Sequence, residues 1–140
     1  MNILQGRDEI TGVFRTAWLA DDDSKNLPVQ YPDVRFDPPD DGAWARLTIQ
    51  HTQGGETSLT NANGQRVYGH VGIVTVQVFT PSGEGQTLSD TLAMIVANAY
   101  RGTRTTGGAV FRNVRTIEVG QTGAWFQVNV TADFDYTEVR

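Results

Sequence analysis

The chain contains no cysteine and very little lysine, and it has no long apolar stretch. Without cysteine the protein has no disulfide, no zinc–thiolate site and no thiol redox chemistry. A membrane helix needs about 20 mostly apolar residues in a row, and no segment of the sequence provides them. The N-terminus also lacks the basic and then apolar pattern of a signal peptide. We therefore expect a protein that folds in a cytoplasm and has no membrane anchor.

Positive charge is scarce. Lysine and arginine number 11 against 16 aspartates and glutamates, so the formal net charge is −5. Binding to a nucleic-acid backbone depends on basic side chains that neutralise phosphates. The arginines are spread along the chain, apart from the pairs Arg101/Arg104 and Arg112/Arg115. Specific nucleic-acid binding is therefore not expected.

Groups suited to catalysis or metal binding are also few. His51 and His70 have no partner at the spacing that metal sites use, so structural roles are expected for both. The sequence has no nucleophile elbow and no phosphate-binding P-loop. Gly83 and Gly85 precede a predicted helix, as in a dinucleotide fingerprint, but Leu88 stands where the third glycine belongs. We predict no catalytic residue, no metal and no cofactor.

Apolar side chains recur at helical spacing in residues 8–20 and again in residues 88–101. Asp8 and Glu9 suit the positive N-terminal end of the first predicted helix. The second is predicted to begin with a capping box formed by Thr87 and Asp90, and Gly102 lies where a left-handed cap belongs. The sequence therefore predicts two amphipathic helices.

Apolar and polar residues alternate in four other segments, which predicts strands over residues 44–53, 66–80, 110–119 and 125–136. Residues 26–42 hold four of the five prolines, which favours a loop with at most a short edge strand. The order of elements predicts a single α+β domain over residues 1–140. Two helices would pack on one face of a mostly antiparallel sheet. A sandwich with peripheral helices is the alternative.

Three sets of residues are candidates for contacts with other molecules. Polar, glycine-containing segments over residues 53–65 and 101–108 are predicted to be flexible partner-contact loops, because loops on a rigid scaffold commonly carry binding. Trp125, on the polar side of the last strand, is a candidate subunit contact. The loop candidates are Gln53, Gly54, Gly55, Asn61, Asn63, Gly64, Gln65, Arg101 and Arg104. Acidic candidates for a channel wall are Asp21, Asp22, Asp23, Asp133, Asp135 and Glu138.

The serial order of several short segments resembles the phage tail terminator-like family, small tail and neck proteins of long-tailed phages, prophages and gene transfer agents. The resemblance spans residues 27–136, and one departure is Asp33, where we expect the family to favour asparagine. The segments that carry it are LPV (27–29), YPDV (31–34), FDPP (36–39), WARL (44–47), RVYGHVG (66–72), VQVFTPSGEG (76–85), VG (119–120), WFQVNV (125–130) and FDY (134–136).

The resemblance implies an α+β virion structural protein that is not an enzyme. Such proteins form a homohexameric ring that caps the tail tube, stops tube polymerisation and gives the head–neck complex a docking surface. The implied partners are other copies of the chain, the major tail tube protein and a head completion or neck protein. DNA passes through the ring without specific binding. Two alternatives remain: another head–tail joining or minor tail protein, and a small-ligand or enzyme domain with a site near residues 83–85.

Overall fold

A computed structural model describes residues 1–56 and 64–140 and shows two helices and one five-stranded sheet. The strand order is β1-β2-β3-β5-β4, and every neighbouring pair is antiparallel except β1 and β2, which are parallel. The α+β prediction is confirmed. The elements are α1 (Ile3–Ala20), β1 (Val29–Gln30), β2 (Trp44–Glu56), β3 (Val67–Pro81), α2 (Thr87–Tyr100), β4 (Val110–Thr122) and β5 (Trp125–Val139).

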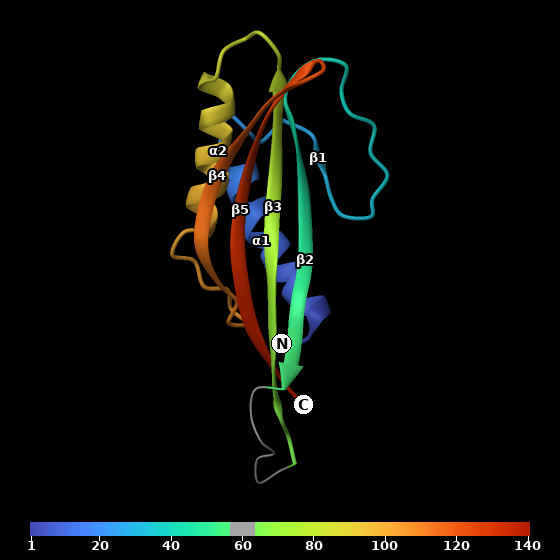
Figure 1. The fold of residues 1–140 in the computed structure, drawn as a ribbon, viewed down its shortest axis with the longest axis vertical. Coiled ribbons are helices and arrows are strands. Elements are labelled where there is room, and N and C mark those ends of the chain that lie inside the picture. The colour runs from blue at the N-terminus through green and yellow to red at the C-terminus, as the bar shows by residue number, and fades with distance from the viewer. Residues whose placement is uncertain (57–63) are drawn as a thin grey trace.

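The alternation of side chains along the strands gives the sheet one buried and one open face. Val74, Val76 and Val78 of β3 are almost fully buried, while the intervening side chains are partly exposed. Both helices lie against the buried face, behind the sheet in Figure 1. The helices contribute Ile10, Phe14, Trp18, Leu92, Val96 and Tyr100 to the core, and the other strands contribute Leu47, Val128, Val130, Ala132 and Phe134.

The first helix begins earlier than predicted, at Ile3, because Asn2 caps it. The Asn2 side chain accepts a hydrogen bond from the Gln5 backbone, and the Gln5 side chain accepts one from the Asn2 backbone. This capping box satisfies two donors that a helix start leaves unpaired. Asp8 and Glu9 therefore lie in the second turn, and the prediction that they occupy the first turn was wrong.

The second helix matches its prediction to within one residue at each end, but its N-terminal cap differs. Gln86 is the N-cap and makes no side-chain capping bond, so the predicted capping box of Thr87 and Asp90 is wrong. Thr91 instead donates to the carbonyl of Thr87 at 2.7 Å. Gly102 follows the helix with φ +67°, as predicted for a left-handed cap.

Glycines at two connections allow turns that other residues disfavour. Gly83 and Gly85, with φ of +87° and +82°, form the turn from β3 to α2. The turn between β4 and β5 is shorter than the gap between the strands predicted over residues 110–119 and 125–136, because Thr122 pairs with Trp125 and only two residues form the turn. Gly123 there has φ +61°. Gly83, Gly85 and Gly123 therefore have a structural role, because they allow the backbone conformations of these turns.

The proline-rich segment crosses the β1 side of the sheet as a projecting loop, residues 31–43 (Figure 1). Two aromatic rings anchor this loop. Tyr31, at its start, packs edge-on against Phe14 at 6.4 Å, and Phe36, near its middle, stacks on Trp44 at 5.4 Å. Asp33 has φ +54°, a conformation in which asparagine and aspartate are enriched. An aspartate is thus compatible with this backbone position.

Candidate assembly surfaces

An aromatic cluster covers one end of the open sheet face. The Trp44 indole stacks on the Phe79 ring, with centroids 4.1 Å apart, and Trp125 packs edge-on against Trp44 at 6.2 Å. Trp44 and Phe79 are 3% and 7% exposed although they lie on the face away from the helices. Trp125 is partly buried by this packing. Its position on the open face follows the predicted register, and its role as a subunit contact stays a prediction.

Arg46 holds this cluster in place. Its guanidinium lies over the rings of Trp44 and Phe79, at 5.4 and 5.5 Å from their centroids. It also donates to the side-chain oxygens of Gln30, at 2.9 Å, and Gln77, at 3.2 Å. A cation over aromatic rings and two hydrogen bonds together fix the side chain. In the sequence, Arg46 stands out only as one of the polar residues that alternate with apolar ones in the strand predicted over residues 44–53.

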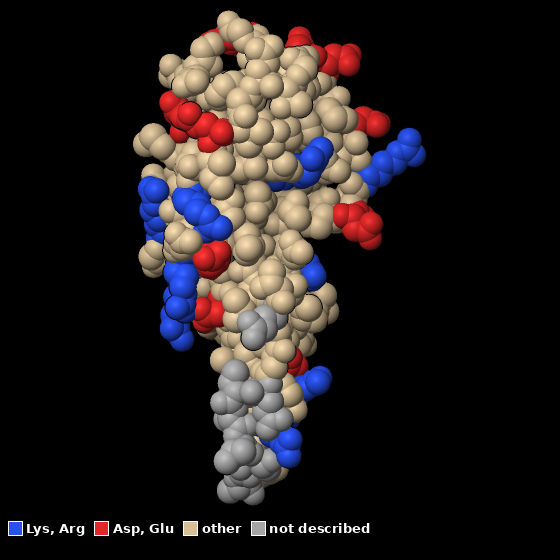
Figure 2. Space-filling model, in the orientation of Figure 1, with Lys and Arg blue, Asp and Glu red and all other residues tan. Residues whose placement is uncertain are grey.

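Asp133 and Asp135 lie further along the open face, beside arginines of the neighbouring strand. Arg112 forms an ion pair with Asp135, and Arg115 contacts Asp133 at 3.4 Å. Both arginines belong to β4, the outer strand on that side of the sheet, where Figure 2 shows basic and acidic side chains next to one another. The two carboxylates are therefore locally compensated.

The acidic residues after the first helix lie in the other layer. Asp21 is the C-cap of α1 and accepts a hydrogen bond from the backbone of Asp23 at 2.9 Å. Asp22 pairs with Lys25 at 2.9 Å. Because α1 covers the buried face, while Asp133 and Asp135 lie on the open face, the structure does not bring the two predicted acidic groups together.

The first of the two predicted partner loops begins within a strand. Gly54 and Gly55 belong to β2 and pair with His70 and Gly69, so their assignment to a loop was wrong. The backbone of Gln53 pairs with Val71 in the same ladder. The physical reason is that a neighbouring strand satisfies the backbone, which outweighs the weak strand preference of glycine. Gly64 and Gln65 are exposed, and Asn61 and Asn63 lie outside the described residues.

The second predicted loop follows α2 and is tied down by hydrogen bonds. Arg101 is the C-cap of α2, and Arg104 forms an isolated bridge with Val110 at the start of β4. The backbone of Gly107 donates to the Glu9 carboxylate at 2.7 Å. Both arginines are exposed. Hydrogen bonds therefore fix the backbone of this segment, while the side chains of Arg101 and Arg104 are exposed to solvent.

Sequence reasoning missed a cluster of histidines and their partners near the free end of β2 and β3. His51 Nε2 lies 2.6 Å from the Tyr136 hydroxyl, and His70 Nε2 lies 3.0 Å from the Glu138 carboxylate. The two imidazole rings are 6.1 Å apart. Glu138, a predicted channel-wall residue, is thus engaged with His70. Only the pairing register of β2, β3 and β5 brings these residues together, so no local sequence signal could have identified them.

Two members of this cluster, His51 and Tyr136, lie in surroundings that favour their neutral forms. Burial, and then the nearby Arg7 and His70, lowers the pKa of His51 below its ordinary value of 6.5. Burial raises the pKa of Tyr136, with Glu138 adding to the rise and Arg7 opposing it. A neutral imidazole can accept the hydrogen bond that a neutral phenol donates. In the described part of the chain, no group of three or more His, Cys, Asp or Glu could hold a metal ion.

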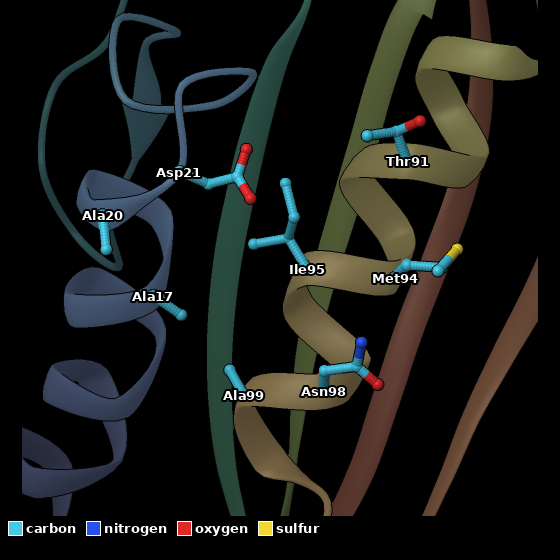
Figure 3. Close-up of a pocket in the computed structure, with 8 residues that line it drawn as sticks. All are labelled: Ala17, Ala20, Asp21, Thr91, Met94, Ile95, Asn98 and Ala99. Atoms are coloured by element: carbon cyan, nitrogen blue, oxygen red, sulfur yellow. The ribbon is translucent and has the colours of Figure 1, made fainter.

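A groove of about 540 Å³ runs between the two helices on the outer side of the helix layer. Figure 3 shows Ala17 of α1 and the adjoining Asp21 pointing toward α2 across it, and Ile95 of α2 pointing toward them. Asp21 is the one carboxylate in this lining, so the groove has no pair of titratable groups for acid–base chemistry.

Of the helices in the described residues, none is long and apolar enough to cross a membrane.

Comparisons with known proteins show the family through a sequence profile and the fold through solved structures. A sequence-family profile described as phage tail terminator protein matches residues 10–134. One solved structure has a TM-score of 0.72 and 17% identity, with 96% of this chain and 95% of the other covered. A chain from the virion of a native gene transfer agent particle has a TM-score of 0.57 and 12% identity, with 94% and 97% covered. A comparison with curated proteins finds no match.

Proposed function

Because the chain belongs to the phage tail terminator protein family, we propose that it forms a ring that caps the tail tube. The family match over residues 10–134 is the observation that carries this proposal, and it makes the chain a structural protein of a phage tail. The ring holds six copies at the head-proximal end of the virion tail. It stops tube polymerisation and offers a docking surface to a head completion or neck protein. Synthesis takes place in the host cytoplasm, before assembly.

Two features of the fold support contacts with partners at the ends of such a ring. At the hairpin of β2 and β3, the described strand ends extend past the helix layer in Figure 1, so they can contact a partner beyond the body of the domain. At the C-terminal end of α2, Arg101 and Arg104 lie on a segment held by hydrogen bonds. We propose that the hairpin and this segment contact the tube and neck proteins, because loops on a rigid scaffold commonly carry binding.

DNA passes through the proposed ring, so its channel wall should repel phosphates. The two acidic groups lie in different layers of the domain. A channel wall formed by one layer therefore holds only one of the two groups. Asp133 and Asp135 are each beside an arginine. Among Asp21, Asp22 and Asp23, by contrast, only Asp22 forms an ion pair within the described residues, with Lys25. We therefore assign residues 21–23 to the channel. Repulsion of this kind acts within about 8 Å at physiological salt.

The decisive experiment adds the purified protein to its polymerising tube protein and images the products by electron microscopy. We expect short tubes of uniform length, each with a ring of six copies at one end. Tubes of unchanged length without a terminal ring would refute the proposal. Imaging of complete virions separates it from a minor tail protein, because a terminator occupies the head-proximal end in several copies.

A further inference from the structure

No described strand pairs along the outer edge of β4. Among the described strands β4 pairs in a ladder with β5 alone, and only the single bridge between Arg104 and Val110 touches its other side. An edge strand of 13 residues presents a row of backbone donors and acceptors that another chain can use. Ile117 and Val119 are also 47% and 49% exposed there.

This edge is positively charged in a chain that is negatively charged overall. Residues 101–122 contain four arginines and one glutamate, a net charge of +3, while the whole chain carries −5. Arg101, Arg104 and Arg112 are exposed. Asp133 and Asp135 lie on the neighbouring strand β5 and pair with Arg115 and Arg112, so they offset part of this charge. The β4 edge therefore combines exposed apolar side chains with a basic rim.

The opposite edge of the sheet has the complementary character. β1 is only two residues long, and beside it projects the loop of residues 31–43, with four aspartates and one arginine, a net charge of −3. All five of these charged residues are exposed, and Val34 is 57% exposed. In Figure 2 basic side chains gather on the β4 side, and acidic ones predominate over the loop on the other side.

We infer that a second copy of this chain docks with its β4 edge against the loop of residues 31–43 on its neighbour. The two surfaces differ and lie on opposite edges of one sheet, so the contact is head-to-tail, the kind that generates a ring when its rotation closes. Apolar side chains lie within charged rims of opposite sign, and this complementarity sets orientation and excludes other pairings. The inference rests on the proposed ring and names its subunit interface.

The test measures self-association of the full chain by sedimentation, and ring formation on tube ends by electron microscopy. An edge variant carries Arg104→Glu and Arg112→Glu, and a loop variant carries Asp37→Arg and Asp40→Arg. We expect each variant alone to associate at least tenfold more weakly than the wild type, and added salt to weaken wild-type association. A mixture of the two variants should restore assembly, with the two chains alternating in each ring.

Arg35→Glu is the matched control. It changes the net charge in the same direction as Arg104→Glu, but it makes the acidic loop more acidic, so association should hold or strengthen. Equal weakening by Arg35→Glu and Arg104→Glu would mean that only total charge matters, which overturns the inference. Because Arg112→Glu places a carboxylate beside Asp135, a variant with Arg104→Gln and Arg112→Gln is measured as well. It should give an intermediate loss while it unfolds at the wild-type temperature.

Cysteine cross-linking tests the geometry, since the chain has no cysteine of its own. Ile117→Cys and Val34→Cys proteins are mixed and treated with a flexible bismaleimide linker. Mixed dimers in excess over either homodimer support the head-to-tail contact, and a preference for Ile117→Cys homodimers overturns it. If wild-type rings cap tubes and the edge variant does so equally well, this interface is refuted and the proposed function stands. If the chain self-associates through these edges but does not cap tubes, the interface is supported and the proposed function is refuted.

Discussion

Two glycines in the same helix should respond in opposite ways to the same substitution. Gly6 and Gly12 both lie inside α1, where alanine is the better helix former by about 1 kcal/mol. A Cβ atom built on Gly12 meets nothing within 4 Å, whereas one built on Gly6 lies 2.5 Å from the Tyr136 ring. Gly12→Ala should therefore raise the free energy of unfolding, and Gly6→Ala should lower it.

The magnitude follows from what surrounds Gly6. Overpacking of a tightly packed site costs about 1–3 kcal/mol. Moving the Tyr136 ring also disturbs its 2.6 Å hydrogen bond to His51, which contributes about 1 kcal/mol. After the helix-propensity gain of about 1 kcal/mol is subtracted, Gly6→Ala should destabilise the domain by about 1–3 kcal/mol. The two variants should thus differ by about 2–4 kcal/mol.

Urea unfolding followed by tryptophan fluorescence measures this difference. The slopes of the transitions should match that of the wild type, so that the midpoints report stability alone. Thermal unfolding gives a second reading, with about 2–4 °C for each kcal/mol in a chain of this size. Equal midpoints for the two variants, or a Gly6→Ala protein more stable than the wild type, would show that the packing of α1 against β5 is not as close as the structure has it.

Acidification should destabilise the protein partly through His51, whose pKa is lowered in the folded state, so that below about pH 6.5 the unfolded chain binds more protons. A His51→Gln variant should lose less unfolding free energy than the wild type between pH 7.5 and pH 5, and an identical loss would contradict this. Ser24→Ala should cost about 1–3 kcal/mol, because the buried Ser24 hydroxyl donates to the Trp18 carbonyl at 2.7 Å; a change below 0.5 kcal/mol (roughly the scatter of surface substitutions) in urea unfolding would count against it. Arg112→Ala should change stability by about 0–1 kcal/mol, since its ion pair with Asp135 is 67% and 37% exposed, and a larger loss by the same assay would exclude a mainly intermolecular role.

Local patterns were enough to predict most of the fold. The apolar spacing of residues 8–20 and the alternation of residues 125–136 predicted elements that the structure confirms as parts of α1 and β5. The errors fall at ends of elements. Gly54 and Gly55 have weak strand preference, but pairing with β3 places them in β2. Asn2 begins α1 through a capping box with Gln5, whereas the usual capping box has Ser or Thr at the N-cap.

By itself the sequence determined the fold class, the family resemblance and the charge of each segment, because periodicity and composition are properties of neighbouring residues. Only the tertiary structure decided on which edge or layer each segment lies and which distant residues it contacts. Residues 31–43 and 101–122 have opposite net charge in the sequence, but the strand order β1-β2-β3-β5-β4 places them on opposite edges of one sheet. The same pairing joins His51 to Tyr136 and divides the acidic groups between two layers. Strand order and register depend on contacts between residues far apart in the chain, and no local pattern contains them.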